Sequence, residues 1–231
     1  MHGELLRQAG ELMTDPNPTP IHLRPTWRGW IHIIAFFAAI PAGVVLLLDA
    51  RDASARISVG IYLLTVLAVF GVSGAYHRLT KTEQAQRLFQ RLDHGMIYLL
   101  IAGSYTPICV LGLPRSWGIP MLGMAGVLAA IGLVLTLVFY GRLPKTAGAL
   151  YLVMGWGLVI CMPTLFQHVS RPVFWLVLAG GAAYTIGFPI LMLERPDPWP
   201  SRFGFHEIWH ALTVIAGGCH FAAVALLVAS R

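Results

Sequence analysis

Two histidines near the end of the sequence, His206 and His210, have the spacing of a metal-ligand pair. Residues four apart lie on one face of a helix, one turn from each other, so both imidazoles can reach the same ion. His77, at the end of a distant apolar stretch, can supply a third nitrogen and leave a fourth position for water. That is the open tetrahedral arrangement of catalytic zinc. Imidazole suits zinc and no redox ligand set is present, so the ion we predict is Zn²⁺.

Two further polar residues accompany His77. Ser73 precedes it by one helical turn and shares its face, and Asp93 opens the next apolar stretch. Ionisable groups at such positions are costly and usually functional. Asp93 is suited to accept a hydrogen bond from a metal-bound water or to orient a histidine. We therefore predict His77, His206 and His210 as metal ligands, with catalytic roles for Asp93 and Ser73.

Other interpretations of this pattern remain open. A lone histidine at a membrane boundary usually bonds to backbone or headgroups, but three at one depth favour a metal. His206-Glu207-x-x-His210 also matches the HExxH motif of zinc metalloproteases. That class needs a third ligand in context, and the nearby acids Glu194 and Asp197 lie outside the apolar runs. Glu207 is about 100° around the helix from His206, so we expect it to face the headgroups.

The remaining histidines have no partner at ligand spacing. His220 lies ten residues beyond His210, about 15 Å along a helix, and we expect a polar contact between helices there. His94 points about 100° away from Asp93. His32 lies near the inner end of the first apolar stretch. The three cysteines sit singly in apolar runs and are expected to be buried hydrophobes rather than ligands: Cys109, Cys161 and Cys219.

These residues must be positioned by membrane-spanning helices. Of the 231 residues, 57% are hydrophobic and only 11% are charged, and the mean hydropathy is +0.70. Soluble domains carry about a quarter charged residues, so a cytosolic enzyme or soluble nucleic-acid-binding protein is excluded despite the net charge of +6. Seven stretches have the roughly 20 apolar residues that a span requires. They cover residues 31–48, 57–76, 95–113, 119–140, 147–166, 173–193 and 206–228.

The fold expected is an all-α bundle of seven transmembrane helices over residues 31–231, preceded by an arm, residues 1–30, without a removable signal peptide. The arm and the even-numbered links carry eleven Lys and Arg, and the opposite side carries five. The positive-inside rule then places the N-terminus and arm in the cytoplasm and the C-terminus outside. The link Lys81–Arg91 has Leu and Phe among its charges and is expected to form an interfacial turn of helix.

Three segments carry a family resemblance: Ser73–Arg78, Arg91–Pro107 and Phe205–His210. Together they resemble the signature blocks of the bacterial hemolysin III family, which belongs with the progestin and adipoQ receptors (PAQR) and, more distantly, alkaline ceramidases. The resemblance implies seven helices, a cytoplasmic N-terminus, and zinc held by three histidines near the inner face of the bacterial cytoplasmic membrane. Matched by position, the implied ligands are His77, His206 and His210, with Asp93 and Ser73 around the metal-bound water.

Three functions are compatible with these observations. The first is a zinc-dependent hydrolase of a lipid amide or ester, with its lipid substrate entering from the inner leaflet. The second is a non-enzymatic sensor or membrane-homeostasis protein in which structural zinc joins two helices. The third, suggested by the family name, is a cytolytic pore, although no span shows a continuous polar face. We expect membrane lipids and no nucleic acid as partners.

Overall fold

The computed structural model describes residues 24–140 and 144–231. Within those ranges the chain is all-helical, and seven helices are long and apolar enough to cross a membrane, which confirms the expected seven-helix membrane fold. Most of the predicted arm (residues 1–23) and the basic residue Arg142 lie outside the described residues, and the cytoplasmic N-terminus stays a prediction. The helices are α2 (Trp30–Asp49), α3 (Ala53–Arg78), α4 (Glu83–Gly112), α5 (Arg115–Leu137), α6 (Pro144–Gly157), α7 (Met162–His168), α8 (Arg171–Leu193) and α9 (Phe205–Ala229).

Helix α4 begins earlier than its apolar run does. Thr82 caps it by accepting a hydrogen bond from the backbone N–H of Ala85 at 3.2 Å. Gln86 and Gln90, one turn apart, are buried on the same face. Most of the link Lys81–Arg91 is therefore helical, as expected, but it forms the first turns of a continuous 30-residue helix and is not set apart from the third span. Its interfacial position stays a prediction.

The fifth span is interrupted instead of continuous. α6 ends at Gly157, a 3₁₀ turn covers Leu158–Cys161, and α7 then runs to His168. Pro163, in the first turn of α7, has no N–H to donate to the carbonyl four residues earlier. The tighter turn and the restart of the helix follow from that missing hydrogen bond.

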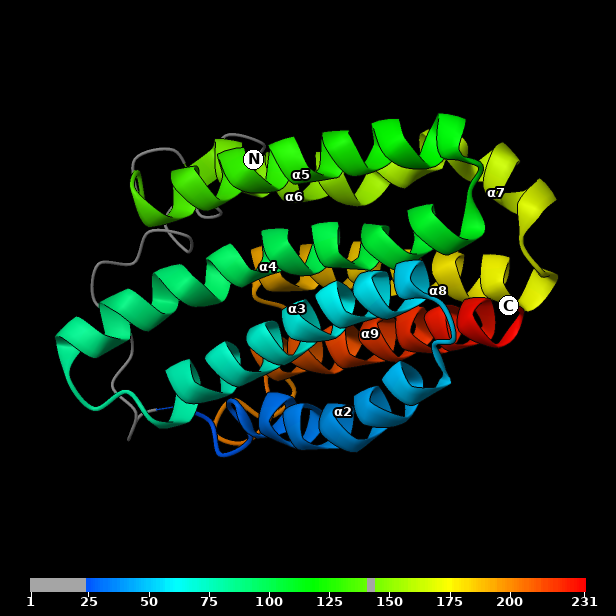
Figure 1. Ribbon diagram of the computed structural model, residues 1–231. Coiled ribbons are helices and arrows are strands. Elements are labelled where there is room, and N and C mark those ends of the chain that lie inside the picture. Colours follow the sequence, from blue (N-terminus) through cyan, green and yellow to red (C-terminus); the bar gives the residue numbers. More distant parts are fainter. Residues whose placement is uncertain (1–23, 141–143) are drawn as a thin grey trace.

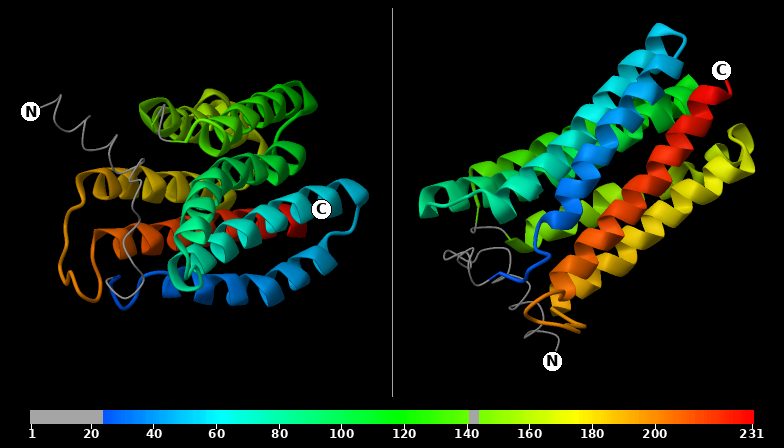
Figure 2. Two further views of the ribbon diagram at one scale, coloured as in Figure 1. Left: turned by 90° about the vertical axis from the view of Figure 1, so that its left-hand side faces the viewer. Right: turned by 90° about the horizontal axis from the view of Figure 1, so that it is seen from below.

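Helix α9 lies at the centre of the bundle, in contact with α2, α3, α4 and α8 (Figure 1). α5 and α6 lie on the other side of α4 (Figure 2). Buried Tyr62 and Val66 of α3 belong to the same core cluster as Val224 of α9. This arrangement brings the last turn of α3 and the first turns of α9 to one end of the molecule, where His77, His206 and His210 stand.

Candidate metal centre

Three imidazoles from two helices converge at this end of the bundle. His77 comes from the last turn of α3, and His206 and His210 come from the first two turns of α9. One ring nitrogen from each lies within 4.8 Å of the others, and the Nε2 atoms of His206 and His77 are 3.3 Å apart. His77 and His210 are buried and His206 is half-buried. The structure thus brings together all three residues predicted as ligands.

The spacing of these nitrogens suits a metal ion. Zinc–nitrogen bonds of about 2.0–2.1 Å at tetrahedral angles separate two ligand nitrogens by roughly 3.3–3.4 Å. The His206–His77 separation of 3.3 Å matches that edge. Nδ1 of His210 is buried without a hydrogen-bond partner among the described residues, which is costly unless another group satisfies the ring. The cluster fits a metal, and its all-imidazole donors are compatible with zinc.

Ser73 and Asp93 lie on the neighbouring helices α3 and α4, and Ser73 is one helical turn from His77 of the cluster. Ser73 is buried one turn before His77 in α3, and Asp93 is half-buried in the third turn of α4. The Ser73 hydroxyl lies within hydrogen-bonding reach of the Asp93 carboxylate. A hydroxyl at that position can donate its one proton to the carboxylate. Ser73 is therefore placed to orient Asp93, and the catalytic roles of both residues stay predictions.

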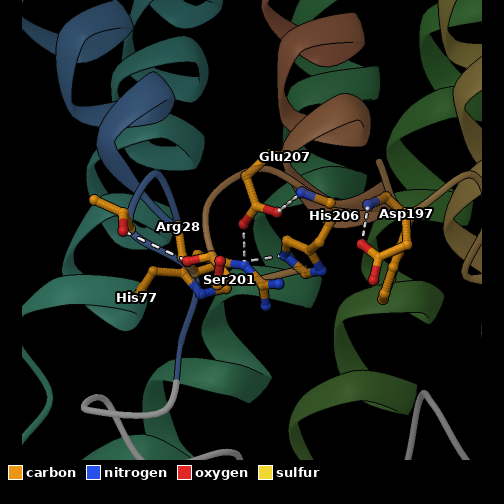
Figure 3. A network of polar contacts seen from close by, with 9 residues as sticks. Arg28, His77, Asp197, Ser201, His206 and Glu207 are labelled. Atoms are coloured by element: carbon orange, nitrogen blue, oxygen red, sulfur yellow. Dashed lines mark hydrogen bonds and ion pairs between the residues drawn. The ribbon is translucent and has the colours of Figure 1, made fainter. Parts of the chain in front are cut away.

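Glu207 does not face the headgroups, so that prediction was wrong. Its side chain is fully buried, forms an ion pair with Arg28, and accepts a hydrogen bond from the backbone N–H of Gly204 at 2.8 Å (Figure 3). The acidic third residue of α9 satisfies an N–H that the helix start would leave unpaired. Glu207 is offset from His206 around the helix, as expected for the next residue, but on that side of α9 it meets Arg28 and not lipid. Glu207 is committed to this ion pair, which gives no support to its role as a protease base.

The segment Arg24–Gly29, here called the strap, lies against the cluster just before α2. Arg24 Nη1 donates to the Tyr76 carbonyl at 2.9 Å. The backbone N–H groups of Thr26 and Trp27 donate to the carbonyls of residues 201 and 202 at 3.2 and 3.1 Å. Gly29 has a φ of 83°, and a Cβ there would lie 2.6 Å from the Cβ of His77. The strap therefore joins the end of α3 to the loop before α9.

A fourth histidine, His32 of α2, belongs to this environment, although its spacing in the sequence gave no sign of it. Its ring is buried and stacks on His210, with centroids 3.9 Å apart. His94 instead contacts the Tyr140 hydroxyl through Nδ1 at 3.3 Å. His220 Nε2 lies 3.3 Å from the Val177 carbonyl of α8, which confirms the expected contact between helices.

Seven apolar helices around a buried three-histidine cluster define an integral membrane protein with a candidate metal centre at one end. Residues 21–221 match the family described as Haemolysin-III related. The chain is similar to hemolysin-3 of Bacillus cereus, at 31% identity over 189 residues, covering 80% of this chain and 83% of that protein. It is also similar to the hemolysin-3 homolog of Bacillus subtilis (strain 168), at 29% identity over 196 residues, covering 84% and 89%.

The chain therefore belongs to the Haemolysin-III related family. An adiponectin receptor protein of Drosophila melanogaster is 27% identical over 221 residues, covering 84% of this chain and 48% of that protein. This likeness supports membership of the wider PAQR superfamily. With bacterial relatives and seven apolar helices, the chain is an integral protein of the bacterial cytoplasmic membrane.

Proposed function

We propose that this protein is a zinc-dependent hydrolase acting on an amide or ester bond of a membrane lipid. The observation that carries the proposal is the convergence of His77, His206 and His210, with two Nε2 atoms at the 3.3 Å separation of tetrahedral zinc ligands. A zinc ion held there would polarise a carbonyl oxygen and make water nucleophilic near neutral pH.

The side chains around the cluster supply the proton transfers. Asp93 is the general base or water-positioning group, because a carboxylate held by Ser73 keeps a fixed direction. After Asp93 has taken a proton, it no longer needs the Ser73 hydroxyl as a donor. The Ser73 proton can then turn to the developing oxyanion. As the C–N or C–O bond breaks, the proton taken by Asp93 passes to the leaving amine or alcohol, which returns the carboxylate to its starting state.

The substrate class follows from the place of the cluster. The histidines stand at the ends of two spans, where we expect a lipid headgroup to meet its acyl chain, and the apolar helices beside them would suit the acyl chain itself. The strap lies over the cluster at the end of α3, where it contacts the Tyr76 carbonyl and passes close to His77. We therefore propose that lipid reaches the centre from the inner leaflet.

Purified protein in lipid nanodiscs, loaded with zinc and offered ceramides and phospholipids, tests the proposal. We expect release of fatty acid by the wild type, a loss of at least 100-fold in Asp93→Asn with metal retained, and no activity in His77→Ala. His220→Ala, which removes a histidine of α9 remote from the cluster, is the matched control and should remain active. A zinc-loaded wild type that leaves every lipid intact, with His77→Ala fully functional in cells, removes the proposal.

A structural metal is the second candidate, favoured by the burial of His77 and His210. A metal between α3 and α9 joins two distant parts of the chain, as expected of a membrane sensor or homeostasis protein held together by zinc. The fourth coordination position separates the two functions. A water there that exchanges with solvent or substrate supports hydrolysis, whereas a fourth protein ligand supports the structural role.

The names of the bacterial relatives suggest a third candidate, a cytolytic pore. Dye release from liposomes at a low protein-to-lipid ratio measures it directly. Release that is abolished by substitutions on one helix face would support a pore, and intact liposomes would exclude one.

A further inference from the structure

His32 and His210 form a close parallel stack that connects α2 to the candidate metal centre. Their ring centroids are 3.9 Å apart and their planes differ by 6°. His32 is 4% exposed, and the ring of Phe70 of α3 lies 5.1 Å from it at a tilt of 51°. His32 is thus in contact with aromatic rings of both helices that supply the cluster, while its own helix supplies no member of it.

A second contact fixes how the His32 ring is protonated. His32 Nε2 lies 2.9 Å from the Thr213 hydroxyl, and that hydroxyl donates its only proton to the His210 carbonyl at 2.8 Å. Thr213 can then only accept from His32, so Nε2 of His32 carries the hydrogen. The ring of His32 is thereby held at two points of α9, by the stack and by Thr213, and both points lie within one turn of His210.

We propose that His32 is a positioning residue for His210, holding the imidazole plane so that its ligand nitrogen faces His77 and His206. The proposal rests on the metal centre of the proposed function. A free imidazole turns about two side-chain bonds, and each turn carries its nitrogens away from a shared ion. Stacking against a ring that is itself fixed by Thr213 restricts those turns. Outer contacts of this kind orient ligands at metal sites and typically change affinity by about 10- to 100-fold.

Zinc affinity of the purified full-length protein, measured by competition with a chelating dye, tests the role of His32. We expect His32→Ala to bind zinc about 10- to 100-fold more weakly than the wild type. His32→Phe keeps the planar ring of the stack but loses the Thr213 contact, so it should bind zinc more tightly than His32→Ala and no more tightly than the wild type. His220→Ala, which removes another half-buried histidine contact of α9, should bind normally. Thermal unfolding of the metal-free proteins shows whether each variant is folded.

The outcomes separate this inference from the proposed function. A wild type that binds no zinc removes both. A wild type that binds zinc, with His32→Ala equally tight, overturns only the positioning role. His32→Phe as weak as His32→Ala also overturns it, since the planar ring would then not be what holds His210.

Discussion

Arg28, two residues before α2, forms an ion pair with Glu207 in the first turn of α9. The two residues are 179 positions apart in the sequence, yet Glu207 directly follows one member of the histidine cluster. Gly29, the next residue after Arg28, lies so near a second member, His77, that a Cβ on it would clash with the His77 Cβ. The pair therefore ties the strap to the helix start that carries His206. The two sides differ in exposure: the Glu207 side chain is fully buried and that of Arg28 is 16% exposed.

The unequal burial predicts an unequal cost of breaking the pair. Arg28→Ala leaves a buried carboxylate without its cation and should destabilise the protein by about 3–5 kcal/mol. Glu207→Ala leaves a guanidinium that can reach water and should cost less. The double variant Arg28→Ala/Glu207→Ala should be more stable than Arg28→Ala alone, because the orphaned charge is gone. Thermal unfolding of the wild type, the two single variants and the double variant in detergent gives a double-mutant cycle. Strictly additive changes in stability would contradict the predicted coupling.

Gly29 should not tolerate a side chain. Its φ of 83° disfavours other residues, and an added Cβ would meet the Cβ of His77 at 2.6 Å. We expect Gly29→Ala to cost about 1–3 kcal/mol and to weaken metal binding, because His77 must shift. Gly60→Ala in α3 is the matched control: nothing lies within 4 Å of its Cβ position, and a helix gains about 0.5–1 kcal/mol from the change. Equal melting temperatures for the two variants would refute the proposed contact.

Asp52 predicts a pH dependence at the opposite end of the bundle. Its carboxylate accepts hydrogen bonds from the Ser54 hydroxyl and the Ala55 N–H and lies 3.6 Å from Arg231, and these contacts, Ser54 foremost, hold its pKa below the ordinary value. A lowered folded-state pKa gives stability that is present above the unfolded pKa, about 3.9, and lost as pH falls through the folded pKa. Asp52→Asn caps α3 without titrating. The melting-temperature advantage of the wild type over Asp52→Asn should shrink below about pH 4; an advantage unchanged at pH 3 would contradict this.

The spans and the candidate ligands could be predicted because they depend on local spacing. Apolar runs of about 20 residues identify the seven helices without any knowledge of their contacts. The separation of His206 and His210 places both on one helix face by geometry alone. Their approach to His77 required only that α3 end and α9 begin on the same side of a membrane.

The contacts around those ligands could not be predicted because they depend on which helices are neighbours. His32 meets His210 only since α2 lies against α9, and no spacing in the sequence encodes that neighbour. Glu207 was assigned to the headgroups because its helical angle said nothing of Arg28, which the strap brings from the other end of the chain. The surroundings of the site depend on tertiary contacts between helices, whereas its metal-ligating residues follow largely from local spacing in the sequence.

Metal removal should lower the stability of the folded protein in proportion to metal affinity. A ligand that binds only the native state stabilises it by RT ln(1 + [L]/Kd), which is about 2.7 kcal/mol at a free concentration 100 times Kd. Because the cluster joins α3 to α9, we expect a chelator to lower the melting temperature of the wild type by several degrees and added zinc to restore it. His206→Ala removes a half-buried donor with little loss of packing, so it should melt near the metal-free wild type and respond to neither treatment. His220→Ala should follow the wild type in both. If the melting temperature of the wild type responds to neither chelator nor zinc, and metal analysis finds no bound metal, then these three imidazoles meet without an ion.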